Sequence, residues 1–269
     1  LRGMDLPELD ITDPASVTHA LKDFRPDVVV NCAAFTRVDA AETEREAAWR
    51  VNADGPRHLA RELTRRGGRL VHLSTDYVFD GRRPPPQPYV ESDQPGPTGY
   101  YGVSKLAGET AVLEACGRHV ILRTAWLYGR HGHNFLKTML RLALRQPDRP
   151  LKVVNDQYGS PTWSERLARQ IDKVVDAGVT GLYHATAEGY GTWFDLACHF
   201  LKAMGLEHEI RPCATAEHPT PARRPANSIL ENARLKAEGL NVMQDWRADL
   251  DAFVARFRED LLAEERARA

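Results

Sequence analysis

The sequence predicts an α/β fold: a Rossmann-like doubly wound parallel sheet with a smaller C-terminal substrate-binding lobe. Short apolar runs alternate with longer helical patterns through the first two thirds of the chain. Near-continuous apolar strands are typical of parallel strands that helices cover on both faces. The 269 residues, 42% hydrophobic and 27% charged, are enough to bury a large core.

The elements follow in a regular order as far as residue 126. We expect strands at 27–34, 69–75 and 119–126, with helices over 43–67 and from Tyr100 onward between them. Beyond that point we expect helices at 134–145, 192–205 and 246–269, and strand-like runs at 151–156 and 181–186. We therefore predict a dinucleotide-binding domain over 1–126 and a mainly substrate-binding lobe over 127–269. Part of that lobe, about 151–177, should return to the sheet.

Composition excludes several classes of partner and site. The formal net charge of -1 gives no electrostatic reason to expect nucleic acid or a membrane surface. No apolar run is long enough to cross a bilayer, and no signal peptide is visible. The four cysteines form no CxxC pair, which argues against a metal knuckle or a disulfide framework. The default expectation is a cytoplasmic protein.

The stretch "YYGVSKLAGE" (100–109) places two tyrosines before a lysine. Residues four apart share a helix face, so Tyr101 and Lys105 can address one ligand while Tyr100 points elsewhere. A free tyrosine has a pKa near 10, and a nearby ammonium lowers it toward the range useful for proton donation. An ordinary buried aromatic beside a solvated lysine is the competing interpretation.

The run "HLSTDYVFDG" puts Ser74, Thr75 and Asp76 at the end of a predicted strand. In doubly wound sheets, ligands bind at the carboxyl ends of the strands. The Thr75 hydroxyl can orient a substrate carbonyl together with the Tyr101 phenol. Local capping of the following loop is an equally ordinary role for Thr75 and Asp76.

Eight motifs, taken together, resemble the dTDP-4-dehydrorhamnose reductase family of extended short-chain dehydrogenase/reductases. They are "DITDP", "NCAAFTRVDAAE", "STDYVFDG", "YGVSKLAGE", "RTAWLYG", "NFLKTML", "VVNDQYGSPT" and "RPANSIL", in the family's order, between about Asp10 and Leu235. The resemblance implies reduction of dTDP-4-dehydro-L-rhamnose to dTDP-L-rhamnose with NADH or NADPH. It also implies a possible homodimer and a possible magnesium ion, whose ligands we do not assign.

The resemblance assigns a role to each matching residue. Tyr101 would protonate the C4 keto oxygen, and Lys105 would hold the nicotinamide ribose and lower the tyrosine pKa. Thr75 would tune Tyr101, Asp76 would touch the sugar, and Trp126 would pack on the hexose. A buried core tryptophan is the alternative for Trp126.

Further positions would contact the cofactor and the nucleotide. The resemblance places the adenine against Asp10 and Ile11. It places Ala33, Ala34 and Thr36 along the cofactor, after the strand that contains "VVVN". Asp5 lies where such folds put an acid on the adenosine ribose, which favours NAD or dual use over NADP alone. Arg224 and Ser228 in "RPANS" are candidate nucleotide-sugar contacts, because arginine suits a diphosphate. Simple turn capping remains open for Thr36, an exposed charge for Asp5 and a surface salt bridge for Arg224.

One family feature has no counterpart in residues 1–30. The family's glycine-rich turn holds the cofactor pyrophosphate on backbone amides, and here Gly3 stands alone. We expect that about one βα unit is missing before Leu1. The remaining chain should then bind NAD(H) or NADP(H) poorly and associate through open strand edges.

Two other functions share part of this pattern. Nucleotide-sugar dehydratases and epimerases belong to the same superfamily, but dehydratases carry a glutamate after Asp76 where this chain has Tyr77. The non-catalytic regulatory β subunit of methionine adenosyltransferase shares "DYVFDG" and the tyrosine–lysine helix. It is less similar at "RTAW" and "DQYGSPT".

Overall fold

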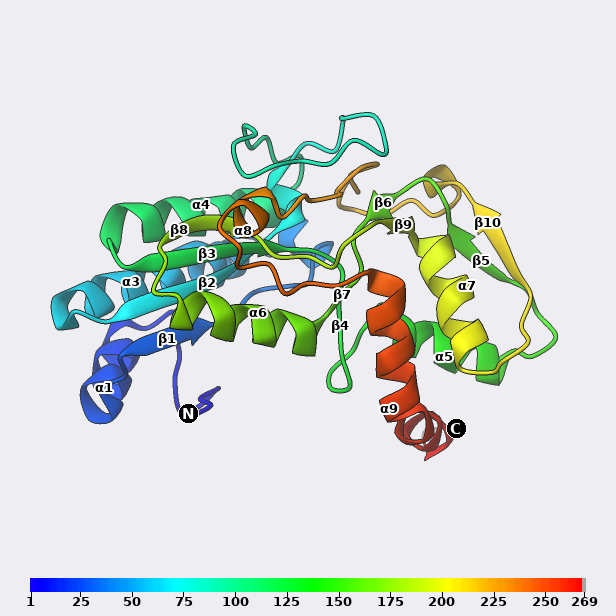
Figure 1. The fold of residues 1–269 in the computed structure, drawn as a ribbon, viewed down its shortest axis with the longest axis horizontal. Coiled ribbons are helices and arrows are strands. Elements are labelled where there is room, and N and C mark those ends of the chain that lie inside the picture. The colour runs from blue at the N-terminus through cyan, green and yellow to red at the C-terminus, as the bar shows by residue number, and fades with distance from the viewer. Residues whose placement is uncertain (268–269) are drawn as a thin grey trace.

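The computed structural model describes residues 1–267 and contains four parallel strands in one main sheet (Figure 1). Strand order is β1-β2-β3-β8, with bounds Val28–Asn31, Arg69–Thr75, His119–Thr124 and Gly181–His184. Each strand pairs in parallel with its neighbour, so a crossover joins every pair. The predicted α/β fold with a parallel sheet is confirmed.

Helices cover both faces of the main sheet. On one face lie α1 (Pro14–Phe24), α3 (Gly55–Arg66) and α4 (Tyr100–Ala115), whose apolar side chains pack on Leu70 and Ile121. On the other lies α6 (Ser164–Asp176), whose Leu167 and Val174 pack on Val71 and Leu122 (Figure 1). Because both faces are covered, the centres of β2 and β3 are mostly apolar, and buried His72 is the polar exception in β2.

The chain after β3 builds a second hydrophobic core beside the sheet. The contributing helices are α5 (Phe135–Arg145), α7 (Trp193–Ala203) and α9 (Trp246–Ala267), whose core includes Phe200, Trp246 and Phe253. Small strand pairs complete this part: β4 (Leu127–Tyr128) with β7 (Thr162–Trp163), β5 (Leu151–Val154) with β10 (Ile210–Cys213), and β6 (Tyr158–Gly159) with β9 (Gly191–Thr192). The short helix α8 (Ala233–Ala237) lies against β8.

Two expected elements differ from the prediction. The expected helix over 43–67 is divided into α2 (Arg45–Trp49), a π-helical segment (Arg50–Asp54) and α3. Asn52 lies in that π-helical segment. Its Oδ1 accepts from the Phe35 backbone N–H at 2.8 Å, and its Nδ2 donates to the Phe35 carbonyl oxygen at 3.1 Å. A π turn holds one more residue than an α turn. The strand expected near 151 pairs with β10 and not with the main sheet, whereas α6 from the same segment does pack on that sheet.

No helix within residues 1–267 is long and apolar enough to cross a membrane. The expected helix over 246–269 is present as α9 through Ala267, and its last two positions lie outside the described residues.

Candidate active site

Seven of the predicted site residues line one cavity of about 340 Å³ at the carboxyl ends of β1, β2 and β3. They are Ala34, Thr36, Thr75, Asp76, Tyr101, Lys105 and Trp126. The location agrees with the rule that ligands bind at this edge of a doubly wound sheet. Leu127 and Trp193, from the chain beyond β3, close the other side.

Helix α4 separates the two adjacent tyrosines as its register predicts. Tyr101 lines the cavity, whereas Tyr100 lies at the helix start, where its backbone N–H donates to Glu42 Oε1 at 2.8 Å. The Arg45 guanidinium lies 5.0 Å from the centroid of the Tyr100 ring, which holds that ring away from the cavity. Tyr101 is therefore the tyrosine that a ligand in the cavity can reach.

Lys105 is 2% exposed, and its Nζ donates to the Leu73 carbonyl oxygen at 2.7 Å. Burial lowers its pKa to about 8, and the nearby Glu109 carboxylate opposes that shift. An ammonium with one backbone acceptor retains two N–H donors for a ligand. The side chain is thus positioned at the cavity floor and titrates close to neutral pH.

Burial raises the pKa of Tyr101 to about 12, and a hydrogen bond with Thr75 partly opposes this shift. The Asp76 carboxylate raises it further because it repels a phenolate. We expected Lys105 to lower this pKa. In the structure burial dominates and raises this pKa, and Lys105 is not among the groups that shift it.

Thr75 and Asp76 form a connected pair at the end of β2. The Thr75 hydroxyl donates to Asp76 Oδ1 at 2.9 Å and accepts from the Tyr77 backbone N–H at 3.2 Å. The capping role considered for Thr75 is therefore real and coexists with its place in the cavity. Burial raises the pKa of Asp76 to about 6, although the Ser228 and Thr75 hydroxyls favour the ionised form.

A buried ion pair supports the floor of the cavity. Arg123 on β3 donates to both carboxylate oxygens of Glu109 on α4, at 2.9 and 2.7 Å. Ser74 on β2 donates to the same carboxylate at 2.5 Å, and all three side chains are at most 5% exposed. Glu109 is one helical turn beyond Lys105, so the network fixes α4 against β2, which ends at Thr75, and β3, which ends two residues before Trp126.

Other predicted residues lie outside the cavity lining, within residues 1–267. They are Asp5, Asp10, Ile11, Ala33, Arg224 and Ser228. Asp10 accepts from the Thr12 backbone and hydroxyl, both at 2.8 Å, which lowers its pKa. Arg224 makes an ion pair with Asp39 at 2.8 Å, the salt bridge considered as its alternative. Buried Ser228 lies close enough to Asp76 to influence its pKa.

The residues that line the cavity and that sequence reasoning missed include Cys32, Tyr77 and Trp193. Tyr77 packs edge-on against Tyr101, with ring centroids 5.6 Å apart. Its place after Asp76 was a usable signal, because both residues belong to one short turn, Asp76–Val78. Trp193 comes from α7, about 90 residues from Tyr101 in sequence, and no local pattern connects the two.

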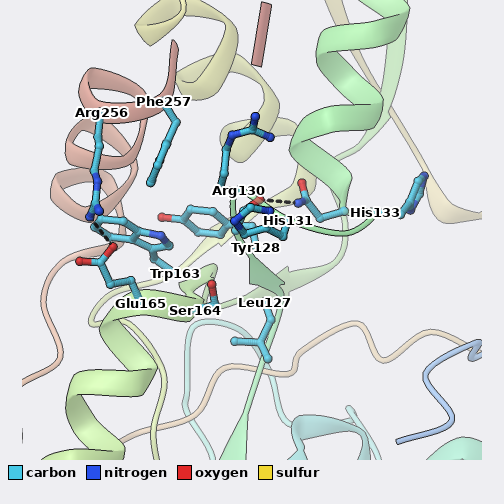
Figure 2. A pocket seen from close by; sticks show the side chains of 12 residues that line it. Leu127, Tyr128, Arg130, His131, His133, Trp163, Ser164, Glu165, Arg256 and Phe257 are labelled. Carbon is cyan, nitrogen blue, oxygen red and sulfur yellow. Dashed lines mark hydrogen bonds and ion pairs between the residues drawn. The ribbon is translucent and has the colours of Figure 1, made fainter. Parts of the chain in front are cut away.

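A larger cavity of about 530 Å³ lies between β4, the start of α5 and α9 (Figure 2). None of the predicted site residues lines it. Its arginines are neutralised by carboxylates: Arg256 pairs with Glu165 at 2.7 Å and Arg130 with Glu264 at 2.6 Å. Size alone therefore does not mark the functional site, and the smaller cavity carries the reactive side chains.

Comparison with known proteins agrees with this geometry. The family model described as "RmlD substrate binding domain" matches residues 1–259. The chain belongs to this family. A Streptomyces griseus protein named dTDP-4-dehydrorhamnose reductase is 44% identical over 90% of this chain and 81% of its own length.

Two further members of the RmlD family extend the comparison. A Streptomyces antibioticus protein named probable dTDP-4,6-dihydroxy-2-methyloxan-3-one 4-ketoreductase is 45% identical, over 96% of this chain and 85% of its own length. A crystal structure of the Bacillus anthracis dTDP-4-dehydrorhamnose reductase in complex with NADP matches with a TM-score of 0.90 and 38% identity. It covers 94% of this chain and 88% of that one.

The family's possible magnesium ion has no counterpart among the described residues. Residues 1–267 contain no group of three or more histidine, cysteine, aspartate or glutamate side chains arranged to hold a metal ion.

Proposed function

We propose that this chain reduces dTDP-4-dehydro-L-rhamnose to dTDP-L-rhamnose with NADH or NADPH. The observation that carries the proposal is the meeting of Tyr101, Lys105 and Thr75 in one cavity at the strand ends. Relatives more than 40% identical are named 4-ketoreductases of dTDP-linked sugars, which supports the same substrate class.

The described residues fit the nicotinamide half of the cofactor. Small side chains at Cys32, Ala34 and Thr36 follow β1 and leave room for a flat ring beside Lys105. The two remaining N–H donors of Lys105 suit ribose hydroxyls. When bound, the nicotinamide supplies two electrons and a hydrogen to the carbonyl carbon. The family member bound to NADP supports a nicotinamide cofactor, and contacts of the other half with Asp5, Asp10, Ile11 and Ala33 remain predictions.

Tyr101 supplies the proton that the reduced carbonyl oxygen needs. With a pKa of about 12 it is protonated at neutral pH and can donate. Thr75 is hydrogen-bonded to Tyr101 and holds the phenol at the end of β2. The Lys105 ammonium stabilises the phenolate that remains after transfer once the ligands bring the two groups together.

The sugar occupies the side of the cavity formed by Asp76 and Trp126. The Asp76 Oδ2 atom is buried and makes no hydrogen bond of normal geometry within residues 1–267, so it can accept from a sugar hydroxyl. The Trp126 indole offers an apolar surface to the C–H face of a hexose. Arg224 reaches the diphosphate if its ion pair with Asp39 opens. The Ser228 hydroxyl favours the ionised form of Asp76.

A second keto-sugar is supported by one specific observation. The Streptomyces antibioticus relative, 45% identical, is named for a different dTDP-linked 4-keto-6-deoxy sugar. Both substrates present a ketone at sugar C4 to the same Tyr101, so the chemistry is shared, and the second sugar as named has one ring hydroxyl fewer.

The assay follows NADPH and NADH consumption at 340 nm with dTDP-4-dehydro-L-rhamnose, and identifies the product by NMR. We expect dTDP-L-rhamnose in stoichiometric amounts. A pull-down with methionine adenosyltransferase is the matched test of the regulatory-subunit alternative. Stable capture of that enzyme, with no turnover of any dTDP-4-keto sugar, would overturn the proposal. The predicted homodimer is checked separately by sedimentation, and the cytoplasmic location by fractionation.

A further inference from the structure

We propose that Trp193 controls sugar binding by covering Trp126, so that the sugar must open a stack of two indoles to bind. This inference rests on the proposed function, which places the sugar against Trp126. It adds a specificity-determining residue from α7 to the site.

The two indoles lie face to face in the ligand-free cavity. Their ring centroids are 3.6 Å apart with an interplanar angle of 7°, and both rings line the cavity that contains Tyr101. Trp193 is the first residue of α7, and Trp126 directly precedes β4. One face of the Trp126 indole is therefore covered by Trp193.

The opposite face of Trp126 is also covered. A Cβ built on Gly159 would stand 2.4 Å from Cε2, 2.6 Å from Cζ2 and 2.7 Å from Nε1 of Trp126. Because the shared ring atom Cε2 is the nearest of the three, Gly159 lies over the ring plane and not beside its edge. With both faces occupied, a sugar can stack on Trp126 only after one neighbour leaves.

Trp193 is the neighbour that can leave. Gly159 is backbone within β6, whereas the half-buried Trp193 is a side chain. Three contacts hold it: the stack on Trp126, a tilted contact with the Phe135 ring at 4.7 Å between centroids, and one hydrogen bond from Nε1 to Gln157 Oε1 at 3.1 Å. The Trp193 backbone stays fixed, because Thr192 and Asp195 form a capping box at the start of α7. Rotation of the side chain therefore uncovers Trp126 without unfolding the helix.

The size of the cavity favours such an opening. Its volume of about 340 Å³ is at the low end of the roughly 300–1,000 Å³ range that holds one drug-sized ligand. A hexose bound together with a nicotinamide ring and ribose exceeds one such ligand. Displacement of the Trp193 ring enlarges the cavity on the side where the sugar would stack.

The test uses dTDP-L-rhamnose, with calorimetry for affinity and near-UV circular dichroism for the indole pair. Two stacked indoles give a coupled dichroism band, which both Trp193→Phe and Trp126→Phe should abolish in the free protein. Saturating dTDP-L-rhamnose should abolish it in the unmodified protein as well. Trp193→Ala should bind the sugar nucleotide about two- to tenfold more tightly, since one aromatic stack no longer has to be opened.

Trp126→Phe should bind dTDP-L-rhamnose more weakly. Substitutions of the two stacked residues should therefore change the affinity in opposite directions. Trp193→Phe keeps a flat ring in place and should fall between Trp193→Ala and the unmodified protein, so a folding defect in the alanine variant does not decide the result. A band that persists at saturation, or weaker binding by both Trp193 variants, would overturn this inference and leave the proposed function standing. If no dTDP sugar binds to the unmodified protein, the proposed function fails and the inference falls with it.

Discussion

Burial sets the protonation states of the two side chains that meet in the cavity. The pKa of Tyr101 is raised to about 12 and that of Lys105 is lowered to about 8. Near pH 7 the phenol is therefore neutral and the amine is charged. A neutral phenol can give its proton to a ketone oxygen, and a charged amine can stabilise the phenolate that results.

The pH dependence of kcat/KM follows from these shifts. Lys105 loses its proton as pH rises through about 8, so kcat/KM should fall on the alkaline side of that value, well below the ordinary lysine range. Asp76 gains a proton as pH falls through about 6 and should give the acidic limb. Asp76→Asn is the control: it should remove the acidic limb and leave the alkaline limb in place. An alkaline limit above pH 10 would contradict the assignment to Lys105.

The sequence identified individual residues well where helix periodicity or strand ends determined their position. Tyr101 was separated from Tyr100 by register alone, and Thr75 by its place at the end of a strand. The direction of the Tyr101 pKa shift was wrong, because the burial that raises this pKa is set by the tertiary fold. Trp193 was missed for the same reason: its stacking partner is distant in the chain.

At the scale of elements, α4 must approach its neighbours closely to present Tyr101 and Lys105. A Cβ on Gly102 would lie 2.2 Å from the Tyr77 carbonyl oxygen, and one on Gly108 would lie 2.1 Å from that of Asn52. Only glycine fits these approaches without displacing the helix. The two glycines of "YGVSKLAGE" therefore have a packing role that the catalytic interpretation of the motif did not require.

Glu109→Gln tests how α4 is fixed to β2 and β3. The change leaves the Arg123 guanidinium, 3% exposed, without its carboxylate partner. Removing one member of a buried pair costs about 3–5 kcal/mol of the free energy of unfolding, measurable by urea denaturation. Glu44→Gln, in the exposed pair with Arg37, is the control and should cost less than about 1 kcal/mol. Equal effects for the two variants would show that the buried network does not fix α4.

The main strands were predictable because their apolar runs and parallel pairing follow from burial on both faces. The interruption of the expected helix over 43–67 was not, because the π turn depends on Asn52 contacting Phe35 and Ser104. The pairing of 151–154 with β10 depends on a segment almost 60 residues further along, and strand partners at that distance leave no local pattern.

At the scale of the whole molecule, the cavity is built by both hydrophobic cores. The sheet supplies Thr75 at the end of β2 and the position of α4, and the second core supplies Trp193 from α7. A ligand in the cavity contacts both and should therefore stabilise the folded chain as a unit.

Thermal unfolding measures this coupling. Saturation with dTDP-L-rhamnose at about 100 times its Kd should stabilise the protein by about 2.7 kcal/mol and raise Tm. Tyr101→Phe should keep the shift, because losing one hydroxyl removes little of the binding contact. An unchanged Tm with ligand present at that excess would contradict a site between the two cores.

The most direct test of the central claim compares Tyr101→Phe with Tyr100→Phe in NADPH-dependent reduction of dTDP-4-dehydro-L-rhamnose. Loss of the proton donor should lower kcat for Tyr101→Phe by roughly 10²–10⁴-fold, the range typical of general acid catalysis. Tyr100→Phe removes the same atom from the adjacent residue, outside the cavity, and should retain nearly full turnover. Equal turnover for the two variants, or a larger loss for Tyr100→Phe, would contradict the account.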